Sequence, residues 1–127
     1  LAELVIERDD WIIMDPKDNE LRETATSNLI FAKDNNLLIP EKKILHGITL
    51  QNLMPYLKKN FSISRGTPRD QNITEFDEIL LCGTGRGVAP LEKISVLGWS
   101  MNGRENFSKI RSLYEEMITS KDATLSL

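Results

Sequence analysis

Two short segments of the sequence have the residue types that bind an anionic group such as a phosphate. The first, His46-Gly47-Ile48-Thr49, leads into a predicted helix. The first amides of a helix have no acceptor within the helix and carry a partial positive charge. Gly47 lets the backbone come close to a ligand, and the Thr49 hydroxyl can add a hydrogen bond. The alternative is a helix cap with nothing bound.

The second segment is a glycine loop, Gly83-Thr84-Gly85-Arg86-Gly87, which follows an apolar strand. Three glycines in five residues can turn successive amides towards one anion. The loop has neither the Gly-Lys-Ser/Thr end of a Walker loop nor the glycine spacing of a dinucleotide-binding loop. A plain turn is the alternative, but two such loops in one small domain suggest that they share one phosphate.

Glu23 is the third residue of chemical interest. It ends a predicted strand and precedes a stretch of small polar residues, 24–28, that could face a ligand. A carboxylate in such a place can hold a proton on a ring nitrogen through a charge-assisted hydrogen bond. The alternative is a glutamate at a strand end that is only solvated.

Composition and charge argue against several classes of function. The chain has 127 residues, enough for one domain, and a net charge of -3, which argues against a dedicated nucleic-acid binder. The single cysteine excludes an internal disulfide. With only one histidine, a Ser-His-Asp triad or a zinc site with several histidines is not expected, so we expect no metal. No apolar run approaches the roughly 18 residues of a membrane span, and no leader is recognised. We expect a cytoplasmic protein with no nucleic-acid or membrane partner.

The elements that would position these residues are those of an α+β fold, a largely antiparallel sheet with two main helices. Short apolar or alternating runs between turn-forming residues predict strands. Asp34-Asn35-Asn36 predicts a tight hairpin, and Pro40 should end the strand before it. The predicted strands are 11–14, 20–24, 29–32, 37–39, 61–64, 79–82 and 88–91, with 79–82 central to the sheet.

Two longer segments show helical spacing. The first begins near Thr49 as N-cap, and Pro55 should kink it or delay its start. The second begins near Glu105, with Phe107, Ile110, Leu113, Tyr114 and Met117 on one face. A brief helical turn is expected at 74–78. The first six residues resemble the end of a preceding helix, so we expect residues 1–10 to be a preceding element or linker, 11–120 a domain, and 121–127 a frayed tail.

The order of these segments resembles the C-terminal domain of the class IV aminotransferases, the fold-type IV enzymes that use pyridoxal 5'-phosphate (PLP). That family includes branched-chain and D-amino-acid aminotransferases and aminodeoxychorismate lyases. The resemblance covers roughly residues 11–114. It rests on Glu23-Thr-Ala-Thr-Ser-Asn28-Leu-Ile-Phe31, Lys33-Asp34, Leu38-Ile39-Pro40, Ile44-Leu45-His46-Gly47-Ile48-Thr49, Asp77-Glu78 and the segment from Gly83-Thr84 to Pro90.

The resemblance implies a role for each residue noted above. Glu23 matches the carboxylate that binds the pyridine nitrogen and keeps it protonated. Ile48 and Thr49 match donors to the cofactor phosphate, and Gly83 with Thr84 match the second half of that phosphate cup. Gly85 matches an amide near the substrate carboxylate. Asn28 resembles a structural or near-site polar residue without chemistry of its own.

The chain also departs from the family pattern. The family's Schiff-base lysine lies a few tens of residues before the position of Glu23, earlier than this chain begins, and Lys17 cannot replace it. The N-terminal domain that closes the site is expected to be missing too. Leu50 stands where the transaminases usually have Arg, and Gly87, beside Arg86, where they commonly have Glu. These changes do not decide between the transaminase and the lyase branch of the family, and they slightly favour the lyases.

The function implied is the cofactor-binding part of a PLP enzyme that contains no catalytic residue itself. Its parent would transfer an amino group between an amino acid and a 2-oxo acid, or eliminate pyruvate from aminodeoxychorismate on the way to p-aminobenzoate and folate. Family members are usually homodimers, so self-association is expected. One alternative is a degenerate, non-catalytic domain of the same fold that acts in assembly or phosphate binding. Another is an unrelated α+β domain with chance motifs.

Overall fold

The computed structural model describes residues 2–6, 10–14, 21–24, 27–41, 47–83, 87–94 and 97–125. Side chains are described within these ranges from Ser27 to Ser120, apart from Asp70.

Eight strands form one mixed sheet around β4 and β7. Strands β1 to β6 follow one another in order, β7 pairs with β4, and β8 pairs with β7. Every pair is antiparallel except β5 with β6, which is parallel and is connected through the first helix. The strands are β1 (Ala2–Ile6), β2 (Asp10–Met14), β3 (Leu21–Thr24), β4 (Asn28–Lys33), β5 (Asn36–Ile39), β6 (Ser62–Arg65), β7 (Glu78–Gly83) and β8 (Gly87–Pro90).

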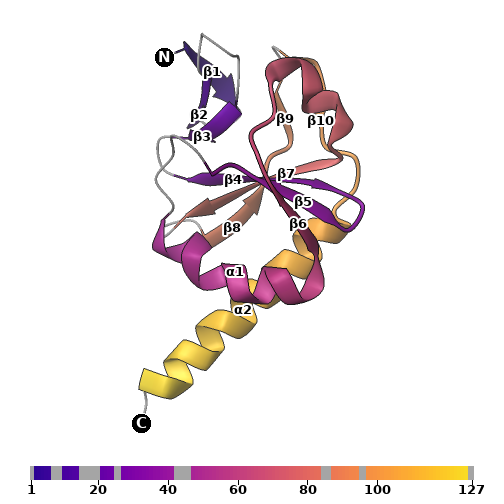
Figure 1. The fold of residues 1–127 in the computed structure, drawn as a ribbon. Coiled ribbons are helices and arrows are strands. Elements are labelled where there is room, and N and C mark those ends of the chain that lie inside the picture. Colours follow the sequence, from indigo (N-terminus) through magenta and orange to yellow (C-terminus); the bar gives the residue numbers. More distant parts are fainter. Residues whose placement is uncertain are drawn as a thin grey trace.

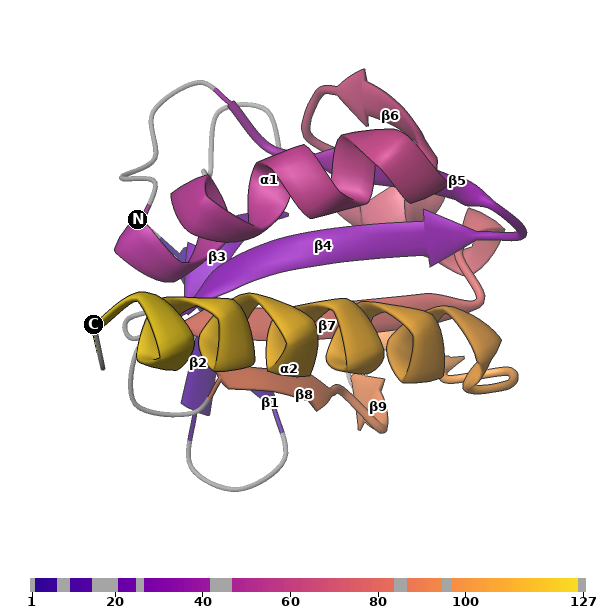
Figure 2. The same ribbon diagram turned by 90° about the horizontal axis from the view of Figure 1, so that it is seen from below.

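The sheet is covered on both faces. Helices α1 (Ile48–Asn60) and α2 (Glu105–Leu125) lie side by side on one face, as Figures 1 and 2 show. The other face carries the short 3-10 helix η1 (Asp70–Glu75) and the hairpin of β9 (Lys93–Ile94) with β10 (Trp99–Ser100). The predicted α+β fold, with two helices and a mostly antiparallel sheet, is confirmed.

This double cover explains why the two central strands each contain four consecutive apolar residues, 29–32 in β4 and 79–82 in β7. On β4, Ile30 and Ala32 belong to the helix-side core, whereas Leu29 and Phe31 belong to the core on the other face. Because successive side chains of a strand point to opposite faces, a strand buried on both sides needs an unbroken apolar run. β7 follows the same rule, and the prediction that this strand is central is confirmed.

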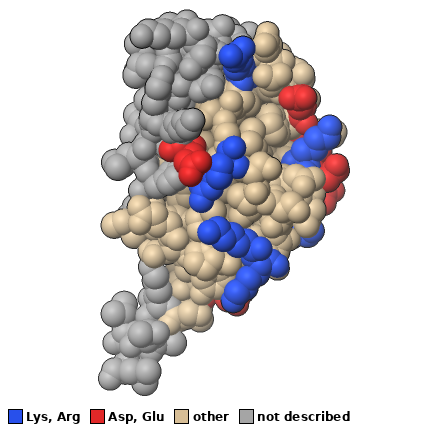
Figure 3. All heavy atoms as spheres, viewed as in Figure 1, with Lys and Arg blue, Asp and Glu red and all other residues tan. Residues whose placement is uncertain are grey.

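The surface is mixed in charge. On the face drawn in Figure 3, Lys and Arg side chains form several separate groups, with acidic and uncharged residues between them. In the part of the chain that the structure describes, no helix has the length and apolar character needed to cross a membrane.

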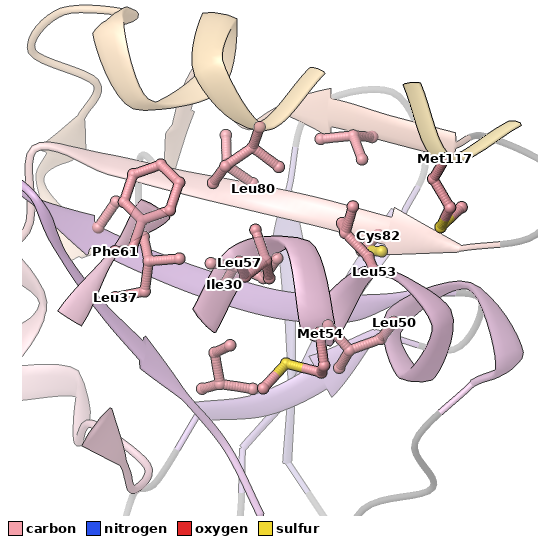
Figure 4. Packing of buried hydrophobic residues seen from close by; sticks show 14 residues of the cluster. Ile30, Leu37, Leu50, Leu53, Met54, Leu57, Phe61, Leu80, Cys82 and Met117 are labelled. Atoms are coloured by element: carbon pink, nitrogen blue, oxygen red, sulfur yellow. The ribbon is translucent and has the colours of Figure 1, made fainter. Parts of the chain in front are cut away.

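The helix-side core holds α1 and α2 against the sheet. Four buried residues of α1, at the helical spacing expected from the sequence, pack onto the apolar strand residues (Figure 4): Leu50, Leu53, Met54 and Leu57. From α2, Ile110 and Met117 are buried in the same cluster. Fully burying one such side chain contributes about 1.5–3 kcal/mol, so this face orients both helices.

The Asp34 hairpin and the end of β5 follow the sequence closely. Asp34 has a φ of 53° in the turn between β4 and β5, a left-handed conformation that Asp tolerates better than most residues. β5 ends at Ile39, immediately before Pro40. Both predictions are confirmed.

Four expectations about element ends are wrong. The first residues form strand β1, not the end of a helix, because they pair with β2 from Ala2 to Ile6. α1 begins at Ile48 with Gly47 as its N-cap, so Thr49 lies inside the helix. Pro55 is interior to α1, so the alternative that it delays the start of the helix is wrong; it is exposed, where water can solvate the carbonyl that a proline leaves without its helical donor. α2 continues to Leu125, since no Gly or Pro interrupts it.

The other face contains elements that were not anticipated. Helical structure near the predicted turn at 74–78 is η1, which ends at Glu75, so that Glu78 already belongs to β7. Strands β9 and β10 are only two residues long, too short for any periodicity. Trp99 on β10 packs in the core and donates its indole N–H to the carbonyl of Phe76 at 2.9 Å. The segment 15–19, between the predicted strands 11–14 and 20–24, has the Asp, Pro and Asn residues of a turn and lies outside the described residues.

Candidate functional site

Three of the segments singled out in the sequence meet at Asn28, the first residue of β4. On one edge of β4, Asn28 is paired with Glu23 of β3; on the other edge it is paired with Cys82 of β7, the residue before Gly83. Its side-chain Oδ1 accepts a hydrogen bond from the N–H of Gly47 at 2.9 Å. Asn28 therefore joins the end of β3, the N-terminus of α1 and the start of the glycine loop.

The fit between Asn28 and Gly47 is close. Asn28 is only 5% exposed, and a Cβ added to Gly47 would lie 3.3 Å from its Oδ1, closer than ordinary van der Waals contact. Glycine is thus suited to this position because the backbone approaches a buried side chain. Asn28 has the structural role that its sequence context suggested.

The N-terminus of α1 has the features of an anion-binding helix end. Its first helical hydrogen bond runs from the Gln51 N–H to the Gly47 carbonyl at 3.1 Å, so the amides of Ile48 and Leu50 precede the helical ladder. The first turn contains no acidic residue that would compete with an anion. Ile48 is 71% exposed and Thr49 is half-buried.

The structure describes the glycine loop only at its two end residues, Gly83 and Gly87. Gly83 closes β7 and is paired with Gly87, the first residue of β8. Gly87 has a φ of 71°, in the left-handed region that favours glycine. Thr84, Gly85 and Arg86 lie outside the described residues.

For Glu23, the structure describes the position of the backbone only. It lies in β3 opposite Ile13 of β2 and Asn28 of β4, and its side chain lies outside the described part of the structure, as does His46. The structure thus brings the backbones of Glu23, Gly47 and Gly83 to one end of the sheet around Asn28.

The model of the class IV amino-transferase family matches residues 3–94, most of the chain. The chain belongs to this family. The resemblance noted in the sequence is confirmed. No individually curated protein matches the sequence.

Solved structures of class IV members share the fold. An aminotransferase from Brucella abortus bound to PLP is 24% identical, with a TM-score of 0.73 over 85% of this chain and 39% of that one. A putative 4-amino-4-deoxychorismate lyase from Legionella pneumophila is 21% identical, with a TM-score of 0.75 over 86% of this chain and 41% of its own. The branched-chain amino acid aminotransferase of Escherichia coli is 19% identical, with a TM-score of 0.71 over 81% and 36%. The chain spans about two fifths of these relatives.

Within this fold, Cys82 is not a nucleophile. It is completely buried in the helix-side core. Burial raises the pKa of the Cys82 thiol to about 11, because the thiolate would lose its hydration. The thiol therefore stays protonated near neutral pH, although its backbone lies opposite Asn28.

Glu78 has a role that sequence analysis missed. It is 3% exposed at the start of β7, and its two carboxylate oxygens accept the backbone N–H groups of Asn106 and Phe107, each at 2.9 Å. These amides belong to the first turn of α2, so Glu78 caps that helix from a strand of the sheet. An acidic residue opening an apolar strand was the available signal, but its partner lies too far along the sequence to be predicted.

A polar depression lies at the end of the sheet away from Asn28. It is lined by residues of the β4–β5 turn, the start of β7 and the residue before it, the segment before α2 and the first turns of α2: Asp34, Asn35, Asp77, Glu78, Asn102, Glu105, Asn106 and Lys109. None of the predicted site residues lines it. Among the residues that the structure describes, no three His, Cys, Asp or Glu side chains are grouped to hold a metal ion.

Proposed function

We propose that this chain is the cofactor-binding part of a PLP-dependent class IV aminotransferase or aminodeoxychorismate lyase. Its parent enzyme would exchange an amino group between an amino acid and a 2-oxo acid, or eliminate pyruvate from aminodeoxychorismate. The observation that supports this best is the junction at Asn28, where one buried side chain and one strand join three segments that match the family's cofactor-binding residues.

The described residues fit a phosphate at the N-terminus of α1. Amides of Ile48 and Thr49 stand in the first turn, where the helix dipole favours a negative charge. Gly83 brings the second loop to the same end of the sheet through its neighbour Cys82, which is paired with Asn28. We assign the phosphate to Ile48, Thr49, Gly83 and Thr84, and a substrate carboxylate to the amide of Gly85.

Glu23 is assigned to the cofactor ring. When bound, PLP supplies an electron-accepting ring that stabilises negative charge on the α-carbon of the substrate. The carboxylate of Glu23 would hold the proton on the pyridine nitrogen by a charge-assisted hydrogen bond. In antiparallel β3, Glu23 is fixed on the strand paired with Asn28, one strand from the phosphate-binding segments.

The proton transfers at the α-carbon are assigned to a lysine outside these 127 residues. In the family pattern this lysine lies a few tens of residues before the position of Glu23. We therefore propose that the chain alone does not catalyse transamination, and that the working enzyme is a cytoplasmic homodimer. With amino donors and PLP, product formation should not exceed the rate of the free cofactor; faster turnover would contradict this assignment.

Ligand titration tests the proposal directly. Pyridoxamine 5'-phosphate is the suitable probe because it has no aldehyde to react with other lysines. Isothermal titration should show binding, weaker by about tenfold or more for pyridoxamine without its phosphate. Glu23→Gln should weaken binding by about tenfold or more, whereas Glu41→Gln, an exposed glutamate beyond β5, should not.

Each outcome of the titration has a distinct meaning. Binding of inorganic phosphate without any dependence on Glu23 would favour the alternative, a non-catalytic domain of this fold. Absence of binding by the unmodified chain would overturn the proposed function.

A further inference from the structure

The ring of Tyr114 lies beside Gly87, on the side where any other residue would carry its Cβ. A Cβ added to Gly87 would lie 3.0 Å from Cε2 and 3.1 Å from both Cζ and Oη of Tyr114. Gly87 is buried and has a positive φ, so both the backbone conformation and the phenol ring disfavour a side chain there. The ring of Tyr114 occupies the space that a side chain at 87 would need.

This contact lies at the candidate site. Gly87 is paired with Gly83, and the neighbouring Cys82 is paired with Asn28, which binds Gly47. α2 lies against β7 and β8 on the helix face of the sheet (Figure 2). Tyr114 is thus the point at which α2 reaches the turn end of the β7–β8 hairpin, where Gly83 and Gly87 are paired.

The ring itself is held firmly by its own helix. Ile110, one turn before Tyr114, and Met117, one turn after it, are both buried in the helix-side core. Residues three and four apart share a helix face, so these two anchors fix the face that carries Tyr114. Gly83 and Gly87 have no side chains to anchor the hairpin end themselves.

We propose that Tyr114 is a positioning residue that holds the Gly83 end of the hairpin in place for the cofactor phosphate. This inference rests on the proposed function and extends it to α2, where no ligand contact is assigned. Removing the ring would leave the two glycines free to shift relative to the N-terminus of α1, and a phosphate shared by two segments is sensitive to their spacing.

The affinity for pyridoxamine 5'-phosphate, measured by titration, tests the proposal. Tyr114→Ala should weaken binding about fivefold or more. Tyr114→Phe keeps Cε2 and Cζ and should restore affinity to within about twofold of the unmodified chain. Phe107→Ala is the matched control: Phe107 also packs on the helix-side core, two turns earlier on α2. If Tyr114→Ala and Phe107→Ala lose affinity for pyridoxamine 5'-phosphate equally, or if neither loses any, the proposal is overturned.

A double variant tests whether the ring and the space at position 87 act together. Gly87→Ala should weaken binding because the new methyl group meets the ring. In Gly87→Ala with Tyr114→Ala that collision is absent, so the combined loss should be smaller than the product of the two single losses. Strictly multiplicative losses would show that the two residues act separately and would count against the proposal.

Amide hydrogen exchange separates this inference from the proposed function. If the unmodified chain binds no pyridoxamine 5'-phosphate, the proposed function fails, but the positioning role is still decided by exchange rates. Exchange at Gly83 and Val88 should accelerate in Tyr114→Ala and not in Phe107→Ala. Unchanged exchange at both positions would overturn the positioning role.

Discussion

At the scale of single residues, Asn28 connects elements that are distant in sequence. Its backbone belongs to the central sheet, while its side chain stabilises the start of α1, nineteen residues later. An asparagine oxygen accepts an N–H without bringing a negative charge. That neutrality matters at a helix end proposed to bind a phosphate.

Two substitutions of Asn28 should separate the effect of its hydrogen bond to Gly47 from the effect of a charge at this position. Asn28→Ala removes the acceptor of the Gly47 N–H and should lower the free energy of unfolding by about 1–3 kcal/mol. Asn28→Asp keeps an acceptor and should retain most of that stability, but its charge should repel the phosphate and weaken pyridoxamine 5'-phosphate binding about tenfold. Urea unfolding and titration measure the two effects.

The exposed Asn102→Ala serves as the control for both measurements. Unweakened binding in the stable Asn28→Asp variant would show that no phosphate lies near Asn28.

At the scale of elements, the buried Glu78 links the sheet to α2. Glu78→Ala leaves the amides of Asn106 and Phe107 without these acceptors, so the free energy of unfolding should fall by about 3 kcal/mol. Glu78→Gln keeps one carbonyl acceptor and should lose about half as much. Urea unfolding gives both values.

Glu105→Ala is the matched control because Glu105 is an exposed acid in the same first turn. Its loss should stay within about 1 kcal/mol. A Glu78→Ala loss no larger than that of the control would contradict the capping role.

Elements with a long apolar pattern could be predicted from the sequence, and those defined by tertiary pairing could not. The face of α1 and the apolar run of β7 carry their own periodicity. Ala2–Ile6 does not: so short an apolar run suits a helix or a strand until a partner, here β2, decides. The same holds at the site, where the glycines were visible in the sequence but the Asn28–Gly47 bond and the Gly87–Tyr114 contact depend on the fold.

At the scale of the whole molecule, the ionisation of the Cys82 thiol makes the free energy of unfolding depend on pH. Cys82 lies on the central strand β7, and burial raises the pKa of its thiol from 9.0 to about 11. Below pH 9 the thiol is protonated in both the folded and the unfolded chain. As the pH rises from 9 to 11, only the unfolded chain loses this proton, so the free energy of unfolding should fall by about 2–3 kcal/mol.

Comparison with Cys82→Ala isolates this effect from other groups that titrate at high pH. The variant should lose stability less steeply between pH 9 and 11, whatever its stability at neutral pH. Parallel pH profiles for the two chains would contradict the assignment. Urea midpoints at several pH values provide the measurement.

The pairing of β4 with β7 also affects the order of folding. These central strands are separated in the chain by β5, α1, β6 and η1, so a long loop must close before they meet. The Asp34 hairpin and α1 are local and can form early, whereas we expect the β4–β7 ladder to form late and slowly. Since Gly83 reaches Asn28 only through this ladder, a partly folded chain cannot present the assembled site. The cofactor would therefore bind only after the rate-limiting step and would slow unfolding rather than speed folding.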